Sequence, residues 1–175
     1  MAALNVSRDG QQKTPVDVFC SPDLSVGLHG HLTFLSVLNS FLSVTAFLGN
    51  ALILIALRRE SSLHPPSKLL LRCLATTDLC VGLISEPLAV NFWMSVVNEN
   101  WNICRYAFVI VLITSSTFNA VSIGTLTAIS VDRLLALLLG LSYRQVVTLK
   151  RTYVFVITYW VVCTICSAMW VWVPR

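Results

Sequence analysis

Residues 106–131 read YAFVIVLITSSTFNAVSIGTLTAISV, a stretch of 26 residues without a charged side chain, and Asp132 and Arg133 follow it directly. With a rise of about 1.5 Å per residue, an α-helix over this stretch is longer than the ~30 Å hydrocarbon core of a bilayer. The stretch therefore predicts a membrane-spanning helix that ends at an adjacent acid and base.

Three further segments have the same character. Residues 32–57 form a run of 26 residues without a charge, residues 152–173 form one of 22, and residues 73–97 are apolar apart from Asp78 and Glu86. None shows the alternating pattern of a membrane β-barrel, and in lipid a single span satisfies its own backbone only as a helix. The sequence thus predicts an all-α membrane protein with four transmembrane helices, over about residues 32–57, 69–97, 105–139 and 152–173.

The composition excludes a water-soluble or disordered chain. Hydrophobic residues make up 56% of the sequence and charged residues only 11%, whereas a soluble domain carries about a quarter charged residues. Disorder requires low hydrophobicity and high charge, which is the opposite pattern.

The distribution of Lys and Arg predicts the orientation. Eight of the twelve basic residues lie on the side that holds the linkers between spans one and two and between spans three and four. The positive-inside rule places that side in the cytoplasm and residues 1–31 outside, as an extracellular tail before a membrane domain over residues 32–173. Asn5 begins a glycosylation sequon on this tail. The tail lacks the apolar core of a cleavable signal peptide, so the first span is expected to serve as the targeting signal.

Polar residues inside the spans carry the functional information. Asp78, Gly82 and Glu86 are spaced by four residues and are expected to share one side of a helix that faces the bundle interior. A charge near the bilayer centre costs about 2.5–3.5 kcal/mol on insertion scales, which favours a function for Asp78. Ser115, Asn119 and Ser122 share a face of the third span, and Asn50 lies within the first. These groups either hydrogen-bond between helices or line a site for a small cation or a water-filled path.

Several motifs occur together and in order along the chain. They are Gly49-Asn50, residues 74–78 (LATTD), Trp101, Ser122-Ile123, residues 126–133 (LTAISVDR) and Trp160. In this combination and spacing the chain resembles the rhodopsin-like (class A) G protein-coupled receptors. The resemblance covers nearly all of the chain after residue 31. It implies the N-terminal part of a seven-helix receptor bundle.

The resemblance implies a sodium-binding cluster within the membrane. Asp78, Asn50 and Ser122 match the positions that hold an allosteric sodium ion in these receptors. No other metal and no further cofactor is implied.

The resemblance also implies a latch at the inner end of the third span. Asp132 and Arg133 match an ionic pair in which the aspartate holds the arginine at rest and releases it toward the G protein. Leu141 and Tyr143 match inner-loop residues that touch the G protein and the latch. A snorkelling pair that only marks the helix end is the alternative interpretation.

The outer half of the spans holds the candidates for ligand recognition, namely Glu86, Ser115 and Asn119. Ser115 stands where amine receptors carry an aspartate, which argues against a conventional monoamine ligand. Glu86 either attracts a cationic ligand group or hydrogen-bonds to a neighbouring helix. Pro87 is expected to kink the second span next to it.

Cys104 is a disulfide candidate with two alternative partners. The family's cysteine in this region lies near Phe108, about one turn later. The family partner would lie in a second outer loop beyond residue 175. Cys20 on the outer tail is the other partner, because both cysteines face an oxidising compartment.

The implied function is a receptor that senses an extracellular ligand and couples to heterotrimeric G proteins at the plasma membrane. Because four spans cannot enclose the family's ligand pocket, we expect the sequence to be a truncated receptor that does not signal by itself. Such a chain is expected to be retained in the endoplasmic reticulum or to pair with other receptor chains. The alternatives are a small four-span channel or transporter subunit and a membrane scaffold protein. An enzyme is not expected, since His29, His31 and His64 form no catalytic or metal-ligand spacing. The inner basic residues are interpreted as topology signals rather than as a nucleic-acid surface.

Overall fold

The structure is a computed structural model of the 175-residue chain, and it describes residues 14–22 and 27–172. The helices are α1 (Pro15–Phe19), α3 (His29–Arg59), α4 (Pro65–Cys80), the π-helical turn η1 (Val81–Ser85), α5 (Glu86–Val97), α6 (Trp101–Leu139), the 3₁₀ turn η2 (Gly140–Ser142), α7 (Tyr143–Val146) and α8 (Leu149–Trp172). No strand occurs in these two described ranges.

The prediction of four membrane-spanning helices is confirmed. Four helical segments are long and apolar enough to cross a bilayer: His29–Arg59, Pro65–Val97, Trp101–Leu139 and Leu149–Met169. Each of the four begins three or four residues before the start predicted from the sequence. The reason is that helical hydrogen bonding continues through the interface, where polar residues such as His29 and Lys150 are tolerated.

The helix ends follow from local chemistry. Pro65 and Pro66 begin α4, where the missing backbone N–H is no loss. Arg58 and Arg59 occupy the last turn of α3, which suits the negative end of the helix dipole. Gly140 ends α6 with φ +48°, a left-handed value that glycine adopts without strain.

The second span is interrupted by the π turn η1, which lies directly before Glu86 and Pro87. A proline at this point removes a backbone donor, and π turns are a usual response to such a defect. The bend expected at Pro87 therefore takes the form of η1. Ser43 of α3 donates to the Gly82 carbonyl at 2.6 Å, so Gly82 faces α3. Asp78 instead contacts α6. The sequence predicted that Asp78, Gly82 and Glu86 share one face of the helix. Asp78 and Gly82 instead face different helices, because a π turn shifts the helical register.

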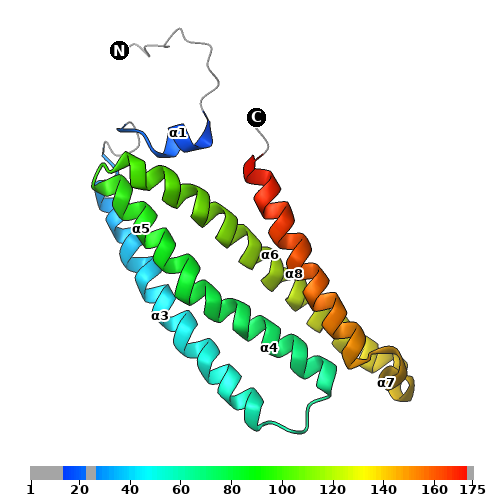
Figure 1. The fold of residues 1–175 in the computed structure, drawn as a ribbon. Helices are drawn as coiled ribbons and strands as arrows, with labels where there is room; N and C mark the ends of the chain where they lie inside the picture. The colour runs from blue at the N-terminus through cyan, green and yellow to red at the C-terminus, as the bar shows by residue number, and fades with distance from the viewer. Residues whose placement is uncertain (1–13, 23–26, 173–175) are drawn as a thin grey trace, which may run out of the picture.

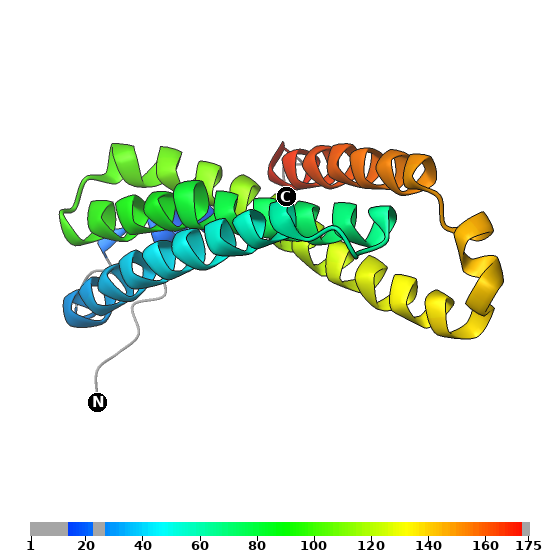
Figure 2. The same cartoon turned by 90° about the horizontal axis from the view of Figure 1, so that it is seen from below.

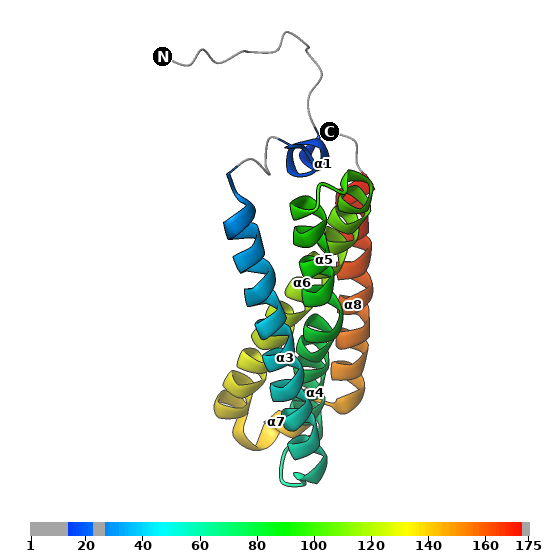
Figure 3. The same ribbon diagram turned by 90° about the vertical axis from the view of Figure 1, so that its left-hand side faces the viewer.

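The helices form an elongated bundle in which α4 and α6 are central. α3 packs on α4 and α5, and α8 packs on α6 and α4. Tyr159 of α8 donates to the Ala120 carbonyl at 3.2 Å, and the Trp160 indole donates to the Cys73 sulfur at 3.5 Å. α1 lies at one end of the bundle and α7 at the other (Figures 1 and 3). In the view of Figure 2 the second half of α6 diverges from α8, and α7 spans the distance between their ends.

Large apolar side chains cover the outside of the bundle rather than a central core. Phe34 is 65% exposed, Leu52 is 67% exposed and Leu137 is 84% exposed. Such a surface is stable against lipid or against further apolar helices, which agrees with four spans that cross a bilayer.

Candidate functional site

Three side chains from three elements meet at the end of the bundle opposite α1, which the charge distribution predicts to be the inner end. Ser67 from the first turn of α4 donates to Asp132 Oδ2 at 2.6 Å, and Tyr143 from α7 donates to Asp132 Oδ1 at 2.5 Å. The two hydroxyl oxygens lie 3.5 Å apart. All three residues are buried, with exposed fractions of 4% to 8%. Hydrogen bonds to a buried carboxylate are among the stronger polar contacts in a protein. We call Ser67, Asp132 and Tyr143 the inner cluster.

The chain reversal after α6 positions Tyr143. Gly140 turns the backbone, η2 continues the turn, and α7 then places the Tyr143 ring eleven residues along the chain from Asp132. Burial and the hydrogen bond to Asp132 raise the pKa of the Tyr143 phenol above its usual range. The phenol therefore stays protonated at physiological pH and remains a donor. Its contribution to stability is complete below the unfolded pKa near 10 and is lost only as the pH rises through the higher folded value.

The predicted ionic pair between Asp132 and Arg133 is not formed in the structure. Asp132 is buried, whereas Arg133 is exposed. Among the residues that the structure describes, the Asp132 carboxylate meets two hydroxyl groups and no cation within ion-pair distance. Both oxygens of the Asp132 carboxylate already accept a hydroxyl hydrogen bond, and the Arg133 side chain lies on the exposed face of α6. The Arg133 guanidinium forms no ion pair with another residue in the described ranges.

Two further residues lie next to the inner cluster. The His64 ring lies against the Tyr143 ring with a centroid distance of 5.1 Å, and its buried Nδ1 has no hydrogen-bond partner in the described part of the chain. Leu141 lies in η2, and its side chain is not among those that the structure describes. Sequence reasoning missed Ser67 and His64. Their only signal was their position beside the Pro65-Pro66 start of α4.

Removing the Ser67 hydroxyl should weaken the joint between α4 and α6. We expect Ser67→Ala to lower the free energy of unfolding by about 1–2 kcal/mol, because it removes one of two donors to a buried carboxylate. Ser130→Ala is the matched control, since its exposed hydroxyl bonds only its own helix, to the Leu126 carbonyl. Unfolding in detergent measures both variants, and equal stabilities would contradict this role for Ser67.

The predicted sodium cluster is assembled only in part. Ser122 of α6 donates to Asp78 Oδ1 at 2.8 Å, which joins the second and third spans. Asn50 instead donates to the Ala46 carbonyl of its own helix at 2.9 Å. A carboxylate and a hydroxyl are oxygen ligands that suit a hard cation. Two of the three predicted residues are therefore in contact and suit a sodium ion, and the Asn50 amide nitrogen bonds its own helix.

The ligand candidates of the outer half are not brought together. Ser115 donates to the Val111 carbonyl of its own helix at 2.6 Å, and Asn119 on the next turn is exposed. Glu86 is half-buried at the start of α5, and no hydrogen bond joins it to another residue in the described ranges. The structure thus shows these three residues as separate polar groups.

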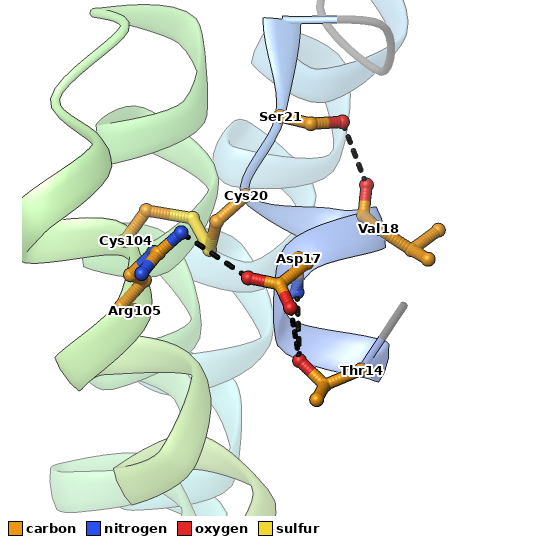
Figure 4. A network of polar contacts seen from close by, with 7 residues as sticks. All are labelled: Thr14, Asp17, Val18, Cys20, Ser21, Cys104 and Arg105. Carbon is orange, nitrogen blue, oxygen red and sulfur yellow. Dashed lines mark hydrogen bonds and ion pairs between the residues drawn. A yellow bond between two sulfur atoms is a disulfide. The ribbon is translucent and has the colours of Figure 1, made fainter. Parts of the chain in front are cut away.

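The outer tail is fastened to the outer end of α6. A disulfide joins Cys20 to Cys104 with a Cα–Cα distance of 5.9 Å. Next to it, Arg105 Nη2 lies 3.1 Å from Asp17 Oδ1, and Thr14 also donates to Asp17, as Figure 4 shows. Of the two partners considered for Cys104, Cys20 is the one that forms the disulfide in the structure. Asn5 lies outside the described residues.

The disulfide is embedded in an apolar cluster. Cys20 and Cys104 are packed with Leu32, Phe92, Val96 and Ala107, and the Phe19 ring stacks on the Phe108 ring at 5.3 Å. Phe108 is the residue near which the family's own cysteine is expected. An aromatic contact thus occupies that position, and the covalent link lies one helical turn nearer the outside.

Comparison with known proteins identifies the family. The family described as "7 transmembrane receptor (rhodopsin family)" matches residues 49–174. Olfactory receptor OR51C1 of Homo sapiens is 34% identical over 127 residues, which cover 71% of this chain and 39% of the relative. Adenosine receptor A2b of Rattus norvegicus is 33% identical over 69% of this chain and 35% of the relative. Muscarinic acetylcholine receptor M3 of Rattus norvegicus is 26% identical over 93% of this chain and 27% of the relative.

These relatives extend well beyond the matched region, since the chain spans between 27% and 39% of their lengths. The four helices observed here are consistent with the N-terminal part of a seven-helix bundle, as the sequence predicted. Because the family match covers most of the 175 residues, the chain belongs to the rhodopsin family of seven-transmembrane receptors.

Proposed function

We propose that these four helices belong to a receptor that senses an extracellular ligand and couples to heterotrimeric G proteins through its inner end. The observation that carries the proposal is the inner cluster beside the exposed Arg133. The two hydroxyl donors satisfy Asp132, so the carboxylate does not need the neighbouring guanidinium. Arg133 then offers five N–H donors to a protein partner on the inner surface.

The inner cluster would also set the shape of the inner loop. Tyr143 ties α7 to Asp132, and Ser67 ties the same carboxylate to α4. A G protein that approaches Arg133 therefore meets a loop that the Tyr143 hydrogen bond holds to α6, at a carboxylate that Ser67 joins to α4. The Tyr143 hydrogen bond therefore restrains α7. An activating change that breaks this bond would free α7 to move.

Asp78 and Ser122 would hold a sodium ion. The ion would supply positive charge against a carboxylate that is costly to keep ionised within the membrane. Without the ion, the Ser122 hydrogen bond partly satisfies that carboxylate. Further oxygen ligands would complete the coordination of the ion.

The proposed location is the plasma membrane, with the tail outside and the basic linkers inside. The Cys20–Cys104 disulfide supports this orientation, because such bonds persist on the oxidising side of a membrane. Glycosylation of Asn5 would mark the same side. Where only four spans are present, we propose retention in the endoplasmic reticulum or pairing with another receptor chain.

Nucleotide exchange on purified heterotrimeric G proteins tests the coupling. Membranes that hold the receptor chain containing residues 1–175 should accelerate exchange, and Arg133→Ala should reduce this acceleration to near background. Arg144→Ala is the matched control, because Arg144 is also an exposed arginine on the inner side. Equal loss in both variants, or exchange that is unaffected by Arg133→Ala, would contradict the proposal.

A further inference from the structure

The linker between α3 and α4 carries two arginines followed closely by two serines. Arg58 and Arg59 end α3, and Glu60, Ser61 and Ser62 follow them. Ser61 therefore has arginines three and two residues before it, and its side chain is exposed. Protein kinases choose their substrates by such charge patterns, and a kinase with an acidic substrate groove selects this one. The pattern indicates a phosphorylation site at Ser61.

The linker is accessible to an enzyme in solution. α3 contains 31 residues and is about 46 Å long, so it extends beyond the ~30 Å hydrocarbon core. The backbone is extended at Glu60, with φ −75° and ψ 123°, and the side chains of Ser61 and Ser62 are exposed. Arg58 and Arg59 lie in the last turn of the helix, where helices fray. A kinase can therefore reach the arginines together with the serine.

The neighbouring Ser62 is the less suitable acceptor. Its hydroxyl donates to Glu60 Oε1 at 2.6 Å, and its backbone N–H donates to the same oxygen at 2.8 Å. Ser62 has an arginine three residues before it, but Glu60 stands two residues before it. An acid at that position would be repelled by an acidic substrate groove. Both observations favour Ser61.

Ser61 also lines a groove of about 940 Å³ between the start of α4 and the start of α8. The same groove is lined by Lys68, Arg72 and Lys150. Lys68 interacts electrostatically with Glu60, so its charge is partly balanced. Arg72 and Lys150 form no ion pair with another residue of the described ranges. A phosphate on Ser61 would therefore meet two cations that come from two different spans.

We propose that a kinase of this specificity phosphorylates Ser61 and that the phosphate then binds Arg72 and Lys150, which joins the linker to α8. In the reaction the Ser61 Oγ bonds to the γ-phosphorus of ATP, the bond from that phosphorus to the departing ADP breaks, and the hydroxyl proton passes to the kinase. A phosphoserine opposite basic side chains gains one to three charge-assisted hydrogen bonds. The proposal rests on the proposed function only for the orientation that exposes the linker to cytoplasmic ATP.

Phosphorylation of the detergent-solubilised chain tests the first step, with magnesium ATP and the catalytic subunit of cyclic-AMP-dependent protein kinase as the probe. Mass spectrometry of the linker peptide should place the phosphate on Ser61. Ser61→Ala should abolish it, and Ser62→Ala should retain it. Arg58→Gln/Arg59→Gln should lower kcat/KM about 100-fold, which is about tenfold for each charged hydrogen-bonding group removed.

The matched control removes two charges outside the recognition sequence. Arg72→Gln/Lys150→Gln should change kcat/KM less than about threefold, because neither residue lies near Ser61 in the sequence. Thermal unfolding checks that both double variants stay folded. A linker without phosphate, a phosphate on Ser62, or equal losses in the two double variants would overturn the site.

Hydrogen exchange of the backbone amides of residues 61–64 tests the binding of the phosphate in the groove. Exchange in the phosphorylated chain should be about three- to tenfold slower than in phosphorylated Arg72→Gln/Lys150→Gln, as expected for an ion pair at the surface. Phosphorylated Arg144→Gln should resemble the unmodified sequence, because Arg144 is an exposed arginine outside the groove. Equal exchange in the phosphorylated chain and in the phosphorylated double variant would overturn the proposed contact. These measurements need neither a G protein nor an oriented membrane, so their failure is distinguishable from failure of the proposed coupling.

Discussion

Replacing Cys20 with serine is expected to lower the free energy of unfolding by about 2–4 kcal/mol. The disulfide joins residues separated by 84 positions, and the loop that it closes contains the first two spans. Without the link, the tail is held to α6 by the exposed Asp17–Arg105 ion pair, which contributes about 0–1 kcal/mol, and by the stacking of Phe19 on Phe108. These contacts are too weak to replace a covalent bond.

Unfolding in detergent, with and without a reducing agent, measures this effect. The reducing agent should bring the unmodified chain to the stability of Cys20→Ser and should leave the variant unchanged. Cys166→Ser is the matched control, because Cys166 is a free and exposed cysteine. A Cys20→Ser variant that is as stable as the unmodified chain would contradict a structural role for the disulfide.

Replacing Gly82 with alanine is expected to cost about 2–3 kcal/mol, the upper part of the range for overpacking. A Cβ at this position would lie 2.9 Å from the Phe47 backbone nitrogen and 2.9 Å from the Ser43 carbonyl oxygen. Both atoms belong to the backbone of α3, so no side chain can rotate out of the way. Close approach through a small residue is how helices associate in lipid, where apolar burial drives little.

Gly49→Ala is the matched control for this substitution. No atom comes within 4 Å of a Cβ built at Gly49, which also lies within a helix. Alanine there should be neutral or should stabilise the chain by up to about 1 kcal/mol, because glycine is a poor helix former. The same chemical change should thus have opposite signs at the two positions. A loss of stability in Gly49→Ala that equals the loss in Gly82→Ala would refute the packing argument.

The spans could be predicted from the sequence because they depend on a local quantity. A run such as residues 106–131 without a charge has one stable environment, and in lipid a single strand cannot satisfy its backbone. The contact between Asp78 and Ser122 could also be predicted from the sequence, because the family resemblance assigns both residues to one cluster. Position along a helix decides such contacts when two spans are already known to be neighbours.

Other features depend on distances that the sequence does not contain. Equal spacing along the chain predicts a shared face only in a uniform helix. The π turn η1 shifts the helical register, so Asp78 and Gly82 do not share a face. The choice of Cys20 over a partner beyond residue 175 depends on how α1 lies across the end of α6. The family resemblance predicted an ion pair between Asp132 and Arg133. In the structure the Asp132 carboxylate instead accepts hydrogen bonds from Ser67 and Tyr143. None of these outcomes follows from residue type or order alone.

We expect the inner cluster to restrain coupling to a G protein. Ligand-independent nucleotide exchange by the receptor chain that contains residues 1–175 tests it most directly. We predict that Tyr143→Phe, which removes one donor to Asp132 and leaves Ser67 in place, raises the basal rate of exchange about threefold to tenfold, the factor that corresponds to a weakened hydrogen bond. Tyr106→Phe should leave the rate unchanged, because Tyr106 is 76% exposed at the other end of the bundle. A basal rate that is unchanged or lowered in Tyr143→Phe would contradict the claim.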